Sequence, residues 1–282
     1  GRHAGRDGFR LLTLMNGDGL ATRGFSYLRR RAFDGVAEVG RVAMLVGDTF
    51  RALGRGVRAF SLVVDQMHAV GVQSLSLVLI VSLFTGAVAA VQAAYQFSSV
   101  VPLKYIGSVI LRSVIIELGP VLTALIVGGR VGAAIAAELG TMRVTEQIDA
   151  LEAMAINPVR YLVVPRVVAA VVMLPILSMI ANAIAIFGGY VVSITSIGVS
   201  THTYVTGLKD FFYMKDLWSG IIKSVFFGGI IGWMGCYYGF RTEGGAEGVG
   251  VATTRAVVSS CVLVLISDYV LANVLFRFIF TS

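Results

Sequence analysis

Long runs of apolar residues, separated by short polar connections, dominate this chain of 282 residues. Several uncharged runs exceed the roughly 20 residues with which an α-helix crosses a bilayer, the clearest being Ala69–Leu103 and Val167–Leu208. The pattern predicts about five spans, over residues 71–95, 113–137, 167–194, 217–238 and 256–278. We therefore expect an all-α, polytopic helical membrane protein whose transmembrane domain covers residues 67–282.

A second pattern precedes the first span and separates apolar from basic positions on a helix. Its apolar positions recur at intervals of three and four, and its arginines form a stripe of their own. These positions are Phe50, Leu53, Val57, Phe60 and Val64, against Arg51, Arg55 and Arg58. The spacing predicts an amphipathic helix over residues 48–66 that lies in the membrane interface, with its arginines among the lipid headgroups. A soluble helix packed on a partner is the alternative.

Composition supports the membrane assignment, because 56% of the residues are hydrophobic and only 14% are charged, against about 25% charged in an ordinary soluble domain. The net charge of +7 is uneven, since residues 1–65 hold eleven arginines against six acidic residues. The basic N-terminal segment, residues 1–47, is typical of contact with anionic lipid and not with nucleic acid.

The distribution of basic residues also predicts the orientation, because short loops rich in arginine and lysine stay in the cytoplasm. One set of helix ends holds the N-terminal arginines together with Arg143, Arg160, Arg166, Arg241 and Arg255; the other holds Lys104, Lys209, Lys215 and Arg277. We expect the first set to be cytoplasmic. This puts the N-terminus in the cytoplasm and the C-terminus on the outer side of the membrane.

Between the second and third spans lies a short acidic segment, "TEQIDALEAMAINP", Thr145–Pro158. We expect a helix over residues 145–157, with Thr145 as N-cap and Asn157–Pro158 as its end. Its carboxylates fan across one side, and its apolar residues share the other. The acidic side holds Glu146, Asp149 and Glu152, and the apolar side holds Ile148, Leu151 and Ala155. Because anionic lipid repels such a helix, a basic groove on a protein partner suits it, and a solvated loop helix without a partner is the alternative.

Ionisable residues inside the predicted spans are a further signal, because each costs at least about 2.5–3.5 kcal/mol to insert unless it is paired. Glu117 and Arg130 lie about 20 Å apart along one straight helix, so each is expected to meet a polar boundary or another helix. For Asp268 the candidate partners are Arg130 and Arg255. Structural pairing is favoured over a proton relay, and Lys223 is expected to snorkel to the outer interface.

Other chemistry has little support in the sequence. Cys236 and Cys261 lie in apolar segments without metal-ligand spacing and are expected to be small core residues. The three histidines, His3, His68 and His202, form no metal-binding motif. No G-x-x-x-x-G-K-[ST] phosphate-binding loop occurs in the chain. We therefore expect no metal and no enzyme activity in this chain, so ATP-driven work requires a separate subunit.

Two sequence runs resemble the signatures of the MlaE (YrbE) permeases. They are "ELGPVLTALIVGGRVGAAIAAELGTMRVTEQIDALEAMAINPVRYLVVPR", residues 117–166, and "GGAEGVGVATTRAVV", residues 244–258. The resemblance implies the permease of an ABC transporter that works as a homodimer. Such a transporter moves phospholipids or related lipids between the inner membrane and a periplasmic MCE-domain carrier.

The same resemblance implies specific partners and residue roles. A cytoplasmic ABC ATPase, which binds ATP and Mg, holds the acidic helix as a coupling helix; this assigns a coupling role to Arg143, Glu146, Asp149, Leu151 and Glu152. This chain itself then holds no cofactor, and a STAS-domain protein belongs to some such systems. For a lipid path we expect an oily wall on the charge-free first span and a facing side on the fifth. The wall residues are Leu77, Leu83, Phe84, Val88 and Tyr95, with Leu271 opposite, although the same residues suit contact with the bilayer equally well.

Two rival functions remain at the level of sequence. A membrane-embedded enzyme acting on lipids requires a nucleophile with a base, or a metal cluster, and the chain offers only scattered histidine and cysteine. An ATP-independent scaffold or lipid scramblase would have the same spans but no ATPase.

Overall fold

The computed structural model describes residues 37–54, 60–97 and 105–277. Within these ranges the chain is helical with short connections and has no β-strand, which confirms the all-α prediction. Five helices are long and apolar enough to cross a membrane: Phe60–Gln96, Ile106–Val144, Val159–Thr195, Met214–Phe240 and Gly245–Leu275. The number of spans predicted from the hydrophobic pattern is therefore confirmed.

Most of the spans are composite helices. The first consists of α3 (Phe60–Met67), η2 (His68–Val72) and α4 (Gln73–Phe97), and the second of α5 (Ile106–Ser113), η4 (Val114–Leu118), α6 (Gly119–Val127), η5 (Gly128–Gly132) and α7 (Ala133–Val144). The third consists of η6 (Val159–Val163) and α9 (Val164–Thr195), and the last two are α11 (Met214–Phe240) and α12 (Gly245–Leu275). Two short helices lie in the connections, α8 (Gln147–Ala153) and α10 (Thr201–Asp210).

The beginning of the first span differs from the prediction. Residues 60–66, which the sequence pattern assigned to the interfacial helix, are continuous with the span, so the span begins eleven residues earlier than residue 71. Residues 37–54 are also helical, while Arg55, Val57 and Arg58 lie outside the described residues. The described residues from 48 onward form one compact unit, and residues 37–47 belong to another. The following description concerns the larger unit.

Short π-helical turns interrupt the second span twice, at η4 and η5. Pro120 stands in the first turn of α6, directly after η4. Because proline has no N–H, it leaves a carbonyl of the preceding turn without its helical partner, which favours a wider turn there. Glu117 lies in η4 and Arg130 in η5. These two charged residues near the middle of the span therefore sit where the regular helix is broken. Turns of this π-helical kind often occur at functional sites.

Close helix packing depends on glycine at the crossings of α9. A Cβ on Gly86 of α4 would overlap the backbone of Ala185, and one on Gly228 of α11 would approach the backbone of Ala170 to 2.5 Å. Lipid tails are as apolar as leucine, so membrane helices gain little from hydrophobic contact alone and associate through such close approach. Glycine at these two positions therefore allows α9 to pack closely along both α4 and α11.

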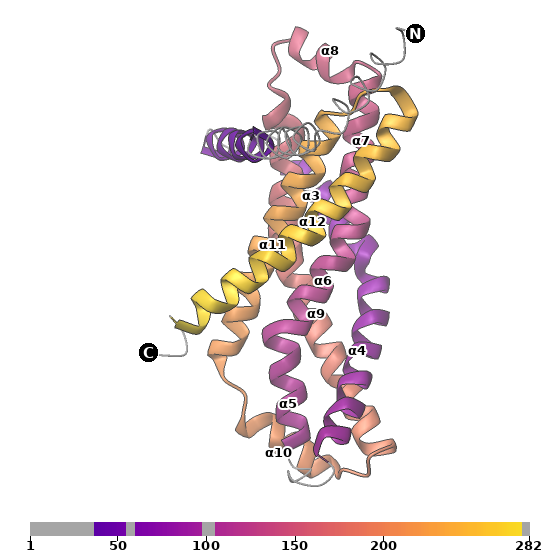
Figure 1. Ribbon diagram of the computed structural model, residues 1–282, viewed down its shortest axis with the longest axis vertical. Helices are drawn as coiled ribbons and strands as arrows, with labels where there is room; N and C mark the ends of the chain where they lie inside the picture. The colour runs from indigo at the N-terminus through magenta and orange to yellow at the C-terminus, as the bar shows by residue number, and fades with distance from the viewer. Residues whose placement is uncertain (1–36, 55–59, 98–104, 278–282) are drawn as a thin grey trace, which may run out of the picture. The chain divides into compact units, whose positions relative to one another are not determined.

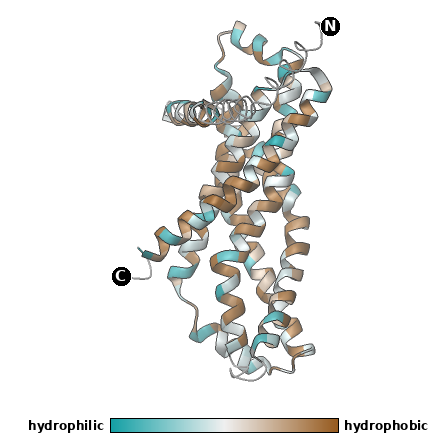
Figure 2. Ribbon diagram, in the orientation of Figure 1, coloured by the Kyte–Doolittle hydropathy of each residue, from teal (hydrophilic) through white to brown (hydrophobic). Residues whose placement is uncertain are grey.

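The two ends of this bundle differ in character. Figure 1 shows α8 at one end and α10 beside α5 at the other. Hydrophobic residues run along the long helices, whereas hydrophilic residues gather on α8 (Figure 2). Two segments outside the spans, α8 and α10, therefore present polar groups at opposite ends of an oily body.

Candidate functional site

A lysine lies fully buried where the second, fourth and fifth spans meet. Lys223 of α11 is 0% exposed, and its Nζ lies 2.6 Å from Oε1 of Glu117 in η4 and 2.9 Å from Oδ1 of Asp268 in α12. Two carboxylates thus face one ammonium group. We call Lys223, Glu117 and Asp268 the charge cluster.

The charge cluster is costly to build and sensitive to change. Moving an ammonium group out of water carries a desolvation penalty of several kcal/mol, and only close countercharges offset it. Glu117 is 43% exposed and Asp268 20% exposed at the side chain, so the two acids carry the charge toward the surface of the chain while the lysine stays inside. Ionised, the three groups sum to one negative charge.

Two sequence predictions about these residues are wrong. Asp268 pairs with Lys223 and not with Arg130 or Arg255. Lys223 does not snorkel to the outer interface, because it is fully enclosed. The long flexible side chain of lysine can reach either the interface or a neighbouring helix. Here it stays inside because two carboxylates, on the second and fifth spans, lie within reach. A signal was present in the sequence, since Lys223 is the only lysine inside the five predicted spans.

A second ion pair, which the sequence reasoning missed, lies beside the charge cluster. Nε of Arg112 in α5 lies 3.1 Å from Oδ2 of Asp216 in α11, and Asp216 is almost fully buried. The Arg112 guanidinium also lies 5.6 Å from the ring centroid of Tyr213. A pocket of about 210 Å³ connects the two ion pairs, and Arg112, Glu117, Ser219 and Lys223 provide its polar lining. Ile116, Ala272, Leu275 and Phe276 complete it with apolar surface.

Arg130 has a separate set of partners on the first span. Its guanidinium donates to Oγ of Ser74 at 2.7 Å and to Oε1 of Gln73 at 3.1 Å. The expectation that Glu117 and Arg130 each meet a different helix is therefore confirmed. Arg130 joins the second span to the first, and Glu117 joins it to the fourth.

The acidic helix α8 is shorter than predicted and starts differently. It runs over Gln147–Ala153, and the residue before it is Glu146 in the left-handed conformation with φ of 59°. Thr145 is not the N-cap, because its hydroxyl donates to the carbonyl of Thr141 in the preceding helix. Asn157 also has another role: its Oδ1 accepts from the backbone N–H of Arg160 and so marks the start of the next helix. The chain reverses too sharply after α7 for the predicted cap.

The side chains of α8 divide as the helical pattern predicted at Ile148 and Leu151, but the prediction is wrong for Ala155, because the helix ends at Ala153. Ile148 is 1% exposed and anchors the helix, whereas Leu151 is half-buried and Ala155, beyond the helix end, is exposed. Glu146, Asp149 and Glu152 are all exposed, and Asp149 forms an ion pair with Arg143. Two large apolar side chains, Met154 and Ile156, are exposed beside these acids. This combination of uncovered apolar and acidic groups is typical of a protein-binding surface.

The apolar residues proposed for a lipid path lie on the outside of the single chain. All five wall residues of the first span are exposed, up to 83% for Tyr95, and Leu271 is half-buried. The five wall residues are Leu77, Leu83, Phe84, Val88 and Tyr95. Their exposure fits a wall facing lipid, a cavity or a second copy equally well, so their role stays a prediction.

The described residues contain no group of three or more histidine, cysteine or acidic side chains placed to hold a metal ion. Cys236 is buried and Cys261 half-buried, and both are free thiols. The core role that the sequence assigned to both cysteines is confirmed for Cys236 but not for Cys261, which is only half-buried.

Comparison with known proteins gives consistent similarities across the spans. Residues 63–274 match the protein family described as Permease MlaE. The chain is 44% identical over 217 residues to a probable ABC transporter permease protein of Rickettsia typhi, covering 77% of this chain and 84% of the relative. It is 36% identical over 244 residues to the intermembrane phospholipid transport system permease protein MlaE of Haemophilus influenzae, covering 81% and 94%. It is also 34% identical over 236 residues to the chloroplastic protein TRIGALACTOSYLDIACYLGLYCEROL 1 of Arabidopsis thaliana, covering 84% and 67%.

Proposed function

The chain belongs to the MlaE permease family, and from that premise we propose that it moves phospholipids or related lipids between the inner membrane and a periplasmic MCE-type carrier. A separate cytoplasmic ABC ATPase, which binds ATP and Mg²⁺, drives the movement, and this chain holds no cofactor. A second copy of the chain completes the transmembrane unit. A STAS-domain protein is a further partner in this proposal.

The surface of α8 is the observation that carries the proposal. The helix is anchored by one buried residue, Ile148, and presents exposed carboxylates beside exposed Met154 and Ile156. An anionic lipid surface repels it, whereas a groove with basic rims and an apolar floor would bind both kinds of group. We therefore assign α8 as the coupling helix, with Arg143 holding Asp149 in place and Glu146, Leu151 and Glu152 facing the ATPase.

Orientation follows from the same assignment. The end of the bundle that carries α8 lies in the cytoplasm, together with the N-terminus, and the end that carries α10 lies in the periplasm, together with the C-terminus. Arg143, Arg160 and Arg166 lie at the α8 end, and Lys209 and Lys215 at the α10 end, as the retention of arginine-rich loops in the cytoplasm requires.

The charge cluster and its pocket belong to the moving part of the transporter in this proposal. Glu117 lies in a π-turn of the second span, which ends, through α7, next to α8. A displacement of α8 is transmitted along that span to the ion pairs with Lys223. The cluster thereby holds three spans in register while the lipid-facing surfaces change their spacing.

The proposal is tested by reversing charge on the coupling helix. In the complex co-expressed with its ATPase, Glu146→Lys with Asp149→Lys should leave membrane insertion intact but release the ATPase and abolish lipid-stimulated ATP hydrolysis. The reason is that a carboxylate facing the basic groove and the ion-pair partner of Arg143 both become positive. The matched control is Glu243→Lys with Glu247→Lys, two exposed acids in the turn before and at the start of α12.

The readouts are the amount of ATPase that co-purifies and the rate of ATP hydrolysis. Unchanged ATPase binding by the α8 variant would refute the coupling role. A chain that moves lipid between leaflets without any ATPase would instead support a scramblase.

A further inference from the structure

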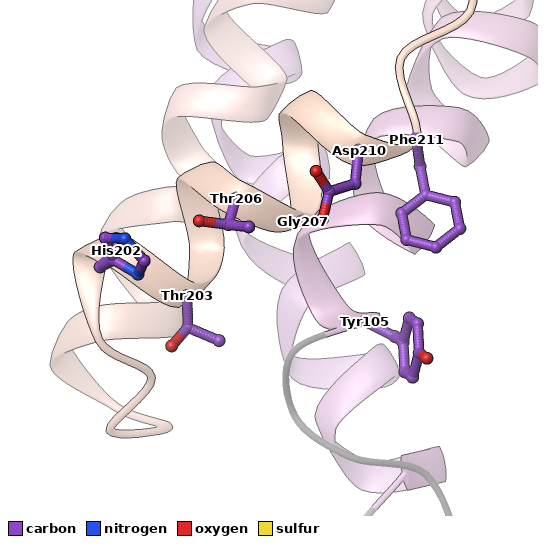
Figure 3. Close-up of a pocket in the computed structure, with 7 residues that line it drawn as sticks. All are labelled: Tyr105, His202, Thr203, Thr206, Gly207, Asp210 and Phe211. Atoms are coloured by element: carbon purple, nitrogen blue, oxygen red, sulfur yellow. The ribbon is translucent and has the colours of Figure 1, made fainter.

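A second pocket lies at the opposite end of the bundle from α8. It has a volume of about 330 Å³, and one face of α10 forms most of its wall (Figure 3). The lining residues are Tyr105, His202, Thr203, Thr206, Gly207, Asp210 and Phe211. In Figure 3 Asp210 and Phe211 lie at one end of this row and His202 at the other, with Thr203 and Thr206 between them.

The spacing of these residues puts different chemistry one turn apart. His202, Thr206 and Asp210 are separated by four residues each, so they share one face of α10 at intervals of about 6 Å along the helix axis. Thr206 thus offers a hydroxyl donor one turn from the carboxylate acceptor of Asp210. The imidazole of His202 is one turn further on.

The helix that carries this row is firmly held. Oγ of Ser200 accepts from the backbone N–H of Thr203 and caps the first turn. Tyr204, on the side of α10 away from the pocket, is buried, and its hydroxyl donates to the carbonyl of Ile186 in α9 at 3.1 Å. Burial raises the pKa of the Tyr204 hydroxyl well above its usual range, so this hydroxyl stays protonated and keeps the bond. The pocket wall is therefore preorganised.

Charge and ring geometry select for a cation near Asp210. Asp210 is exposed and forms no ion pair among the residues that the structure describes, and neither lysine nor arginine lines the pocket. Beside it the rings of Tyr105 and Phe211 lie edge to face, with centroids 5.8 Å apart. A carboxylate in a pocket that aromatic rings also line attracts an ammonium group mainly through its charge, and an exposed ring face adds the attraction of its quadrupole.

The level of the pocket in the membrane points to a lipid headgroup as its ligand. Phe212, Tyr213 and Trp218, which follow the pocket residues in the chain, are all exposed large aromatic side chains. Aromatic residues of this kind gather at the boundary between membrane and water, at the level of the headgroups. These residues therefore indicate that the chain next to the pocket lies at the level of the headgroups.

We propose that the pocket binds a phosphoethanolamine headgroup, with its primary ammonium on Asp210, in the same pocket as the rings of Tyr105 and Phe211, and its phosphate on the hydroxyl of Thr206. This inference rests on the proposed function for its lipid substrate and narrows that substrate to an aminophospholipid. A phosphoglycerol headgroup lacks the cation that Asp210 would hold. A phosphocholine headgroup has no N–H to donate to the carboxylate.

The experiment measures binding of short-chain lipids to the purified chain in a neutral detergent by native mass spectrometry. Dihexanoyl phosphatidylethanolamine, phosphatidylcholine and phosphatidylglycerol are compared at equal concentration, with soluble O-phosphoethanolamine as a fourth probe. The expected order is phosphatidylethanolamine, then phosphatidylcholine, then phosphatidylglycerol. Asp210→Asn should weaken phosphatidylethanolamine binding about tenfold, since it removes one charge-assisted contact, and should remove the preference over phosphatidylglycerol.

The control is Lys209→Gln, which changes the charge by one unit in the opposite direction on the neighbouring residue of α10, outside the pocket lining. It should keep the preference for phosphatidylethanolamine. Equal binding of the three lipids, or a preference that survives Asp210→Asn, would overturn the inference. Tighter binding of O-phosphoethanolamine than of the lipid would overturn the membrane source of the ligand.

Failure of this inference is distinguishable from failure of the proposed function. Asp210→Asn reports on α10, and the charge reversal at Glu146 and Asp149 reports on the ATPase at the other end. If lipid preference is absent but charge reversal on α8 still releases the ATPase, the pocket assignment falls and the transporter assignment stands.

Discussion

Two groups of ion pairs in this chain use the same chemistry in opposite surroundings. Arg143 at the end of α7 pairs with Asp149 of α8, where both side chains are about half exposed. Lys223 pairs with Glu117 and Asp268 between three spans, where the lysine is fully enclosed. An exposed charge that loses its partner is hydrated by water, so the loss costs little free energy. A charge between the spans has no water to replace its partner, so the loss costs much more. The comparison teaches that position, and not the kind of pair, sets the energetic consequence.

The largest expected effect comes from removing the enclosed ammonium. Lys223→Met leaves Glu117 and Asp268 facing each other without a countercharge, and loss of one partner from a buried pair typically costs about 3–5 kcal/mol. We expect the detergent-solubilised variant to unfold at a clearly lower temperature than the unmodified chain. Thermal unfolding followed by circular dichroism measures the change.

A triple variant serves as the control for that prediction. Lys223→Met together with Glu117→Gln and Asp268→Asn removes all three charges while keeping similar side-chain volumes, so most of the lost stability should return. If the single and triple variants were equally unstable, the loss would reflect packing of the lysine stem and not uncompensated charge.

A smaller effect is expected at the pair of intermediate burial. Arg112→Gln deprives Asp216 of its cation, and Asp216 is only 3% exposed; an uncompensated buried acceptor costs about 1–3 kcal/mol, or more when charged. Asp216→Asn should cost less, because water reaches Arg112, which is 42% exposed. Comparing the unfolding temperatures of the two variants tests this asymmetry, and equal losses would contradict it.

The smallest effect is expected beside α8. Arg143→Gln breaks a pair whose two side chains are both substantially exposed, so the free energy of unfolding should change by at most about 1 kcal/mol. The difference from the unmodified chain should shrink further as salt is added, because exposed charges are screened. Unfolding measured at low and high salt checks this, and a salt-independent loss as large as that of Lys223→Met would remove the distinction between the two regions.

Several features of the fold could be predicted from the sequence because they depend on local or additive properties. The five spans follow from runs of apolar residues that are long enough to cross the membrane. Inside hydrocarbon every backbone N–H and C=O group must be hydrogen-bonded, so such a run forms a helix. The amphipathic division of α8 follows from helical spacing, and Ile148 is indeed its buried residue. The wide turns at Glu117 and Arg130 were not predicted, because Pro120 by itself permits either a kink or a straight helix.

The candidate sites were predicted less completely. Glu117 and Asp268 were identified as unusual because a carboxylate in a span is costly wherever it lies, but their common partner was assigned elsewhere. Arg112 and Asp216 were not identified at all, since they lie 104 residues apart in the chain and near predicted span ends, where charged residues are common. The α10 pocket was missed for a related reason: Tyr105 and Asp210 come from separate connections, and neither forms a motif alone.

By itself, the sequence determined that this protein is a bundle of five apolar helices with an acidic helix between the second and third, because burial in hydrocarbon and helical periodicity act within each segment. The tertiary structure alone decided that Lys223 lies between Glu117 and Asp268, that Arg130 reaches Ser74, and that Tyr105 closes the pocket on α10. These contacts depend on how helices rotate and cross. Rotation and crossing are set by close packing at small residues such as Gly86, and many arrangements of the same five helices would satisfy the same hydrophobic pattern.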